Sequence, residues 1–181
     1  MFPLILLCIV VAMAVTYFLS RKLQLSTRMG ILVAVGTSIC GATAIVATAP
    51  SIGADDEEVA YALANITVFG VVAMFAYPIL AKVLFAEDML SAGRFLGTAI
   101  HETGQVAGSG LIYAELFSAE RVLDVATVTK LIRNLFMILV IPLMAWVSFR
   151  TNSFSDGIRT HKGSIRSLFP TFIIGFILLS V

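Results

Sequence analysis

The sequence predicts an all-α integral membrane protein with about six transmembrane segments. Hydrophobic residues make up 59% of the 181 residues and charged residues only 13%, whereas about a quarter of a soluble domain is charged. A chain this short leaves much of its surface exposed after folding, so one core cannot hide this apolar content. We therefore expect residues 1–181 to form a single transmembrane domain surrounded by lipid, or a portion of a longer transporter fold.

Apolar windows along the chain place the expected segments. A spanning helix needs about 20 mostly apolar residues, and six windows reach or approach that length. They cover residues 1–20, 30–50, 59–81, 95–114, 131–149 and 167–181. No basic region precedes the first window, so we expect a membrane helix there rather than a signal peptide. The last window is short and stops at Val181, which indicates a truncated segment.

The distribution of basic residues predicts the orientation. Of the twelve Lys and Arg residues, nine follow the first, third or fifth window. The positive-inside rule then places loops 21–28, 82–94 and 150–166 in the cytoplasm and the N-terminus outside. Loop 51–58 is expected on the opposite side of the membrane from loop 21–28.

Several classes of function find no support in the sequence. The net charge is +1 and no basic stripe is present, so we expect no nucleic-acid partner. Cys8 and Cys40 lie in apolar segments and are expected to be free thiols. The sequence contains no phosphate-binding loop, dinucleotide-binding fingerprint, paired-cysteine metal motif or nucleophile elbow. We expect no enzymatic activity, no cofactor and no metal.

The window Gly36–Gly53 is unusual because small residues fill most of it. Small residues let helices approach closely, and they also let a backbone unwind where it lines a cavity. Transporters use such discontinuous helices to present half-helix N-termini to anions. The sequence alone leaves both roles open for this window, close helix packing and an unwound backbone. The acidic run Asp55–Glu58 that follows is expected to cap the next helix rather than to bind a metal.

A second unusual window, Gly93–Gly110, carries His101 and Glu102 in an otherwise apolar segment. Ionisable residues at membrane depth usually mark a pathway, a proton relay or a paired site, although these two could simply bond a neighbouring helix. Either window could be broken or re-entrant. The pairs Gly93/Gly97 and Gly104/Gly108 have GxxxG spacing, which predicts close helix contacts.

The run from His101 to Gln105 also resembles half of a zinc-protease motif. That chemistry needs two histidines four residues apart on one helix face. Gln105 stands where the second histidine would be, and His161 belongs to a distant loop. The pattern therefore argues against a metalloprotease.

Two basic residues lie one turn apart near the start of the fifth window. Basic side chains near helix ends usually snorkel to the interface, and we expect this for Lys130. Arg133 could snorkel, or it could face the bundle and there either balance Glu102 or attract an anion.

These motifs, in this order, resemble the YeiH-like family of bacterial membrane proteins, whose members are labelled sulfate exporters. The resemblance spans about residues 30–180 and includes the two windows above together with Thr67–Gly70, Tyr77–Pro78, Lys130–Arg133 and Phe169–Phe172. It implies a multi-pass secondary carrier of the bacterial inner membrane, distantly similar to bile-acid:sodium symporters, with inverted repeats and crossed broken helices. Family members are nearly twice as long, so this chain resembles their central portion.

The residues and the resemblance together predict a secondary transporter of a small anion such as sulfate. The expected substrate-binding residues are Ser38, Cys40, Gly41, Thr43, His101, Glu102, Gln105 and Arg133. His101 and Glu102 would relay a proton or sense substrate charge. The expected partners are the lipid bilayer, the anion and a coupling proton or sodium ion, with a homo-oligomer or a partner membrane subunit left open. The alternative is a non-transporting subunit or truncated relative that assembles with other membrane helices.

Overall fold

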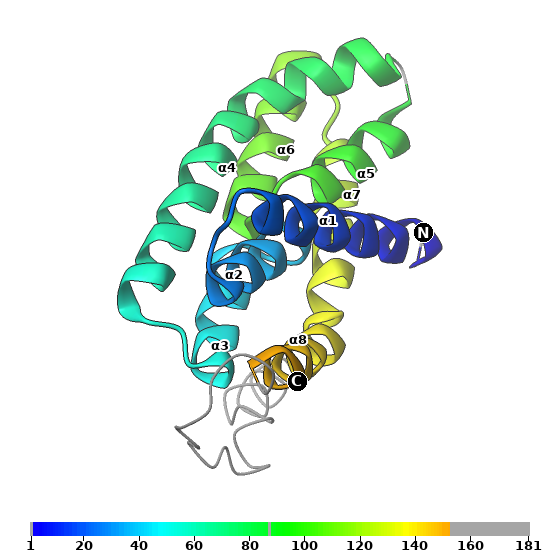
Figure 1. Ribbon diagram of the computed structural model, residues 1–181. Coiled ribbons are helices and arrows are strands. Elements are labelled where there is room, and N and C mark those ends of the chain that lie inside the picture. Colours follow the sequence, from blue (N-terminus) through cyan, green and yellow to red (C-terminus); the bar gives the residue numbers. More distant parts are fainter. Residues whose placement is uncertain (1, 87, 153–181) are drawn as a thin grey trace.

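The computed structural model describes residues 2–86 and 88–152, and in this part of the chain helices joined by short loops are the regular secondary structure (Figure 1). The helices are α1 (Phe2–Lys22), α2 (Thr27–Ser38), α3 (Ala42–Ile52), α4 (Asp56–Phe85), α5 (Met89–Ala99), α6 (Thr103–Phe117), α7 (Arg121–Leu135) and α8 (Met137–Asn152). The expected segment 167–181 and His161 lie outside the described residues.

Three stretches of helix are long and apolar enough to cross a membrane. They are α1, α4 and the stretch Arg121–Met144, in which α7 continues into α8. In α1, only 11% of the most apolar window is buried inside the protein, so most of this helix is available to lipid. The all-α membrane class predicted from composition is therefore confirmed.

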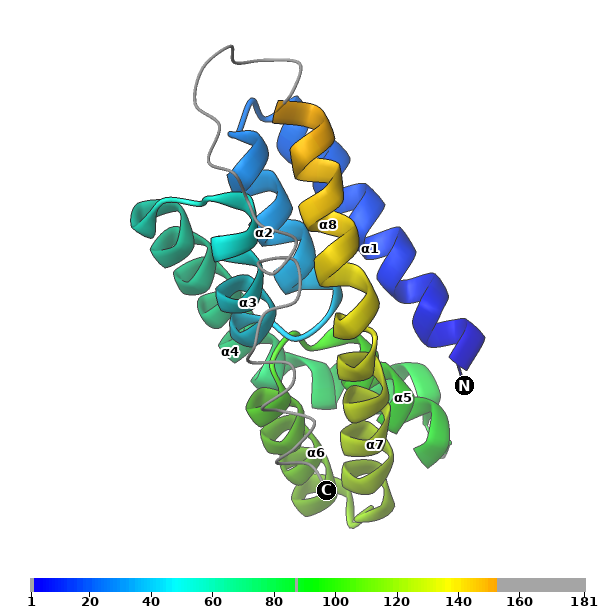
Figure 2. The same cartoon turned by 90° about the horizontal axis from the view of Figure 1, so that it is seen from below.

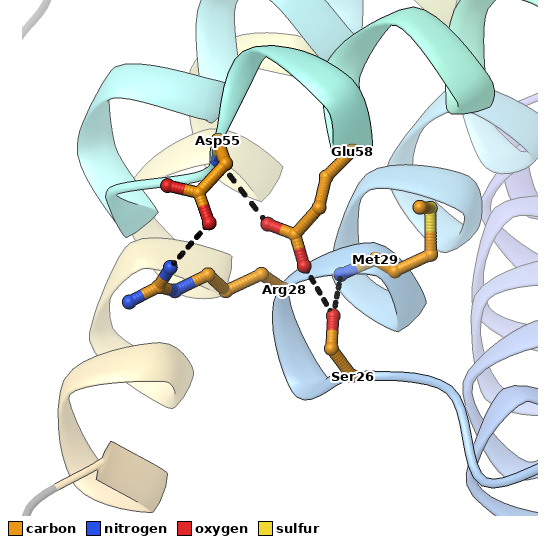
Figure 3. A network of polar contacts seen from close by, with 5 residues as sticks. All are labelled: Ser26, Arg28, Met29, Asp55 and Glu58. Carbon is orange, nitrogen blue, oxygen red and sulfur yellow. Dashed lines mark hydrogen bonds and ion pairs between the residues drawn. The ribbon is translucent and has the colours of Figure 1, made fainter.

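The predicted discontinuous window Gly36–Gly53 forms a helical hairpin. At its open end, Arg28 Nη1 at the start of α2 lies 3.3 Å from Asp55 Oδ2 just beyond α3, and Ser26 donates to Glu58 (Figure 3). These contacts require α3 to run back alongside α2, because a straight path would separate their far ends by more than 30 Å at ~1.5 Å per residue. We call α2 and α3 hairpin 1 and residues 39–41 its tip.

The window Gly93–Gly110 contains a second hairpin, formed by α5 and α6. A Cβ atom on Gly93 of α5 would lie 2.6 Å from Val125 Cβ, and one on Gly110 of α6 would lie 2.9 Å from Leu123 Cα. Both ends of the window thus meet the first half of α7, so the chain must reverse between them. We call this pair hairpin 2 and residues 100–102 its tip. Its helices have 11 and 15 residues, too few to span a bilayer alone.

The long helix α4 shows that the two hairpins enter from opposite ends. Ile66, near its middle, is the nearest neighbour of a Cβ built on Gly36 or Gly41 of hairpin 1. Thr67 accepts a hydrogen bond of 3.3 Å from Gln105 Nε2 of hairpin 2. Figure 2 shows α2, α3 and α8 in the upper half of the molecule and α5, α6 and α7 in the lower half. The two tips therefore meet midway along α4.

This arrangement corrects part of the expected topology. Both windows are discontinuous, as predicted, but each doubles back in a re-entrant hairpin rather than forming the crossed broken helix that the family resemblance implied. The expected separation of loops 21–28 and 51–58 is wrong, because Arg28 pairs with Asp55. Loop 82–94 instead lies at the far end of α4 from loop 21–28. The charge asymmetry that placed the N-terminus outside therefore no longer holds.

Two separate apolar cores flank the tips. One joins hairpin 1 to α1, α8 and the first half of α4, with Ile5, Ile45 and Ile141 at its centre. The other joins hairpin 2 to α7 and the second half of α4, with Leu96 and Val122 at its centre. The layer between these cores holds the polar groups described below.

Close packing through glycine fixes hairpin 2 on both α7 and α4. A Cβ on Gly97 would lie 2.5 Å from the Ala126 carbonyl oxygen, and one on Gly108 would lie 2.8 Å from Met74 Sδ. These contacts confirm the close approach that the GxxxG spacing predicted. Gly104 is the exception, because a Cβ there would meet nothing within 4 Å.

Alanine at Gly97 is expected to lower the free energy of unfolding by about 1–3 kcal/mol, because its methyl group overpacks the α5–α7 contact. Gly104→Ala is the matched control and should leave stability unchanged or raise it by up to about 1 kcal/mol, since alanine favours helix over glycine. Denaturant unfolding in detergent, followed by circular dichroism, measures both. Equal losses from the two substitutions would contradict the close packing of α5 on α7.

Candidate site between the hairpin tips

Backbone carbonyl groups gather where the two tips meet. The last four carbonyl groups of an α-helix have no partner within the helix, and they form the negative end of the helix dipole. α2 ends at Ser38 and α5 ends at Ala99, so each hairpin brings one such end to the middle of the molecule. Two negative helix ends therefore converge in an otherwise apolar interior.

The ammonium group of Lys130 lies between these ends. Its Nζ donates hydrogen bonds to the carbonyl oxygens of Ile39 at 2.8 Å, Ile100 at 3.0 Å and His101 at 2.5 Å. The side chain is 0% exposed. The prediction that Lys130 snorkels to the interface is therefore wrong, since α7 places it at the tips, where unpaired carbonyl groups solvate the charge.

One turn further along α7, Arg133 makes the same kind of connection. Its Nε donates to the Ser38 carbonyl at 2.7 Å, Nη2 to Thr37 at 2.7 Å and Nη1 to Thr98 at 2.5 Å. Arg133 is 2% exposed, so it faces the bundle, one of the two possibilities left open by the sequence. Each cation thus bonds both hairpins, and each hairpin contributes three of the six carbonyl groups.

These two buried charges have no carboxylate partner among the described residues. The ion pair recorded in that part of the chain joins Arg28 to Asp55 at the far end of hairpin 1. Isolated charges are costly to bury unless they are paired or fully hydrogen-bonded. Here the carbonyl dipoles supply the hydrogen bonds but cancel no net charge. Glu102, in the tip of hairpin 2, offsets at most one of the two positive charges, so the tip region keeps an excess of positive charge.

The positive ends of two other helices lie at the same place. Gly41 precedes α3 and Glu102 precedes α6, and neither provides a side-chain cap. A Cβ on Gly41 would lie 3.5 Å from the His101 carbonyl oxygen and 3.6 Å from Glu102 Cβ. The two uncapped N-termini are therefore neighbours, and backbone N–H groups there suit an anion.

Three helix N-termini at the outer ends of the hairpins have side-chain caps, unlike the two N-termini at the tips. Ser26 Oγ accepts from the Met29 N–H at 3.0 Å, and Glu58 Oε2 accepts from the Asp55 N–H at 3.2 Å (Figure 3). Asp88 Oδ1 accepts from the N–H groups of Leu90 and Ser91, each at 3.1 Å. The capping role expected for the acidic run at Asp55–Glu58 is confirmed. Side-chain caps thus close the N-termini of α2, α4 and α5, whereas α7, like α3 and α6, begins without one.

The structure brings most of the predicted site residues of hairpin 1 to the tip. The Ser38 backbone contacts Arg133, whereas its hydroxyl donates to the Ala34 carbonyl at 2.6 Å. The buried Cys40 places Sγ 3.5 Å from Met137 Sδ. Gly41 forms the turn with φ +55°. The side chain of Thr43 is exposed, so only its place in the first turn of α3 keeps it at the site.

The predicted residues of hairpin 2 also lie at the tip or one turn beyond it. His101 and Glu102 are half-buried, and His101 Nδ1 is buried without a hydrogen-bond partner. Gln105 is bonded to α4 through Nε2, and its Oε1 is likewise buried and unpaired. Unpaired buried polar atoms are uncommon in native proteins, and a buried water molecule or a ligand is one way to satisfy them.

Sequence reasoning left Lys130 and Asn134 out of the site. Asn134 Nδ2 donates to Thr103 Oγ1 at 3.2 Å, which ties α7 to the first turn of α6. The available signal was the spacing of Lys130 and Arg133, which places both on one face of α7. Nothing in the sequence identified the carbonyl groups that accept hydrogen bonds from Lys130 and Arg133. These carbonyl groups lose their partners within the helix only where the chain reverses.

Fold and site together define an integral membrane protein in which two re-entrant hairpins meet around buried cations. The model of the family described as Conserved hypothetical protein 698 matches residues 1–181, and the chain belongs to this family, whose curated relatives are called UPF0324 membrane proteins. The YeiH-like resemblance noted from the motifs is thereby confirmed.

Three curated relatives show the extent of the similarity. The chain is 34% identical to a UPF0324 membrane protein of Fusobacterium nucleatum over 99% of its length and 50% of the relative's. It is 30% identical to one of Clostridium perfringens, over 92% and 48%, and 36% identical to one of Streptococcus pyogenes, over 99% and 52%. The chain thus spans about half the length of these relatives. No solved structure matches it.

Proposed function

We propose that this protein is a secondary transporter of a small anion, which binds between the hairpin tips. The observation that carries the proposal is the pair of buried cations, Lys130 and Arg133, without a carboxylate partner in the described chain. An anion at the tips would offset this excess charge and accept hydrogen bonds from the uncapped N-termini of α3 and α6.

The position of the site also suits transport. Secondary transporters bind their substrates near the bilayer midplane, where interrupted helices leave backbone groups free. Here both tips lie midway along α4, which is the longest of the spanning helices. We place the protein in the bacterial inner membrane, where a carrier of this kind can couple an anion to a proton or sodium gradient. His101 and Glu102 are the groups we assign to a proton relay, since both are half-buried at the tip.

Purified protein in liposomes is expected to carry at least one anion from the set sulfate, sulfite, chloride and small carboxylates. Arg133→Lys should raise the half-saturating anion concentration by about tenfold or more, because lysine cannot reproduce the planar guanidinium fork. Arg121→Lys, at the exposed start of the same helix, is the matched control and should behave as wild type. Radiolabelled uptake and anion-evoked current measure the effect.

The same liposomes test the relay. His101→Ala and Glu102→Gln should each alter how flux depends on pH when it is measured between about pH 5 and 8, because each substitution removes a side chain that can exchange a proton. Unchanged flux in both variants across this range would refute the relay. Silence of the wild-type protein with every anion would refute transport by this chain and favour the alternative, a non-transporting subunit that assembles with other membrane helices.

A further inference from the structure

The hydrogen-bonding capacity of the two cations differs at the tips. A lysine ammonium has three N–H donors, and all three of Lys130 are bonded to carbonyl oxygens. An arginine guanidinium has five N–H donors, and three of Arg133 are bonded, which leaves two without a partner among the described residues. Arg133 can therefore still bind a ligand directly, whereas Lys130 has no donor left.

The partners of Lys130 show what its bonds hold. Ile39 and the pair Ile100 and His101 follow the last residues of α2 and α5, and they belong to different hairpins that start at opposite ends of the molecule. Gly41 and Glu102 follow in the two tips, and a Cβ built on Gly41 would lie 3.5 Å from the His101 carbonyl oxygen and 3.6 Å from Glu102 Cβ. Lys130 thus fixes residues one or two positions before Gly41 and Glu102, the N-cap residues of the two uncapped helices.

We infer that Lys130 is a positioning residue, which holds the two hairpin tips together through their backbone carbonyl groups and does not contact the transported anion. The role of the anion in this inference rests on the function proposed above. The positioning role of Lys130 does not rest on that function, because it follows from the three hydrogen bonds of its ammonium group alone. Arg133 shares the task but keeps two N–H donors for the anion.

The two cysteines of the chain provide a readout that does not depend on transport. Cys40 lies in the tip of hairpin 1, next to the Ile39 carbonyl that Lys130 binds, and is 4% exposed. Replacing Cys8 with alanine leaves Cys40 as the single thiol of the chain. The rate at which a small water-soluble methanethiosulfonate modifies Cys40 then reports whether the tips stay closed.

The experiment compares this background with three further substitutions, in the full chain reconstituted in liposomes. Lys130→Met keeps an unbranched side chain one atom shorter than lysine but removes every donor, so Cys40 modification should accelerate by about tenfold or more as the carbonyl groups turn toward water. Lys130→Gln keeps two N–H donors and should give an intermediate rate. Leu131→Met changes the exposed neighbour on α7 and should leave the rate within about twofold, as surface changes generally do.

If Cys40 is modified at the same rate in Lys130→Met as in Leu131→Met, the inference is overturned, whatever the transport assays show. If Lys130→Met does not fold, Lys130→Gln decides on the same criterion. Flux then separates positioning from binding: Lys130→Gln should lower the maximal rate with less than about a threefold change in half-saturation, whereas Arg133→Lys should mainly raise half-saturation. The reverse pattern would show that Lys130 binds the anion. Faster modification of Cys40 without any anion flux would support the tip-holding role while refuting the proposed transport.

Discussion

Replacing Arg133 with methionine is expected to lower the free energy of unfolding by about 3–5 kcal/mol, because it leaves the carbonyl groups of Thr37, Ser38 and Thr98 without donors. These groups lie in a layer that is almost inaccessible to water, since Arg133 is 2% exposed. A backbone acceptor deprived of its partner in such a place keeps its full desolvation penalty. Part of the loss is recovered where the tips separate and admit water, which would also destroy the geometry of the site.

The measurement is reversible unfolding in mixed detergent micelles, followed by circular dichroism. Arg121→Met is the matched control, because Arg121 stands at the exposed start of the same helix, and its replacement should change stability by no more than about 0.5 kcal/mol. Similar stability of the two variants would mean that the guanidinium hydrogen bonds contribute little. The cation would then be present for ligand binding alone.

Composition was sufficient to predict the membrane class, because a chain that is 59% hydrophobic and carries few charges is compatible with lipid as its surroundings and not with water. The small-residue windows were also sufficient to locate both interruptions. Glycine in Gly36–Gly53 and Gly93–Gly110 serves the two purposes expected of it: Gly41 makes a turn with positive φ, and Gly97 permits close helix contact. The interruption and the packing are local properties, which a sequence encodes directly.

The direction of the chain after each interruption could not be predicted in this way. A straight broken helix and a hairpin have the same composition, and a window of about 20 residues fits either. The reversal is determined by contacts distant in sequence, such as Arg28 with Asp55 and Gly110 with Leu123. Counting each window as one crossing therefore moved loop 51–58 to the wrong side, and the positive-inside rule could not detect the error.

The buried state of Lys130 escaped prediction for a related reason. Snorkelling is the usual behaviour of a basic residue near a helix end, and that expectation assumed that α7 begins at the interface. In the structure, α7 begins nine residues earlier, at Arg121, and continues into α8, so Lys130 reaches the middle of a span. Its partners are backbone carbonyl groups, which carry no sequence signature. A buried cation can thus be solvated entirely by atoms that every residue possesses.

Valine at Gly41 is expected to destabilise the protein by about 3–5 kcal/mol, through backbone strain combined with overpacking. Gly41 has φ +55° and ψ −119°, a conformation that suits the first central residue of a type II′ turn and favours glycine. A β-branched residue with positive φ is a genuine outlier. The added Cβ would also lie 3.2 Å from Ile66 Cγ2, so the tip would have to move away from α4.

Gly53 separates these two causes. It has φ +63° but no heavy atom within 4 Å of a built Cβ, so Gly53→Val tests backbone strain alone and should cost about 1–2 kcal/mol. Unfolding of both variants in detergent gives the comparison. An excess loss at Gly41, together with faster modification of Cys40, would show that the tip depends on close approach as well as on its turn. Equal losses of unfolding free energy at Gly41 and Gly53 would mean that the tip has room to adjust. A tip with such freedom could not hold the N-termini of α3 and α6 at a fixed separation around an anion.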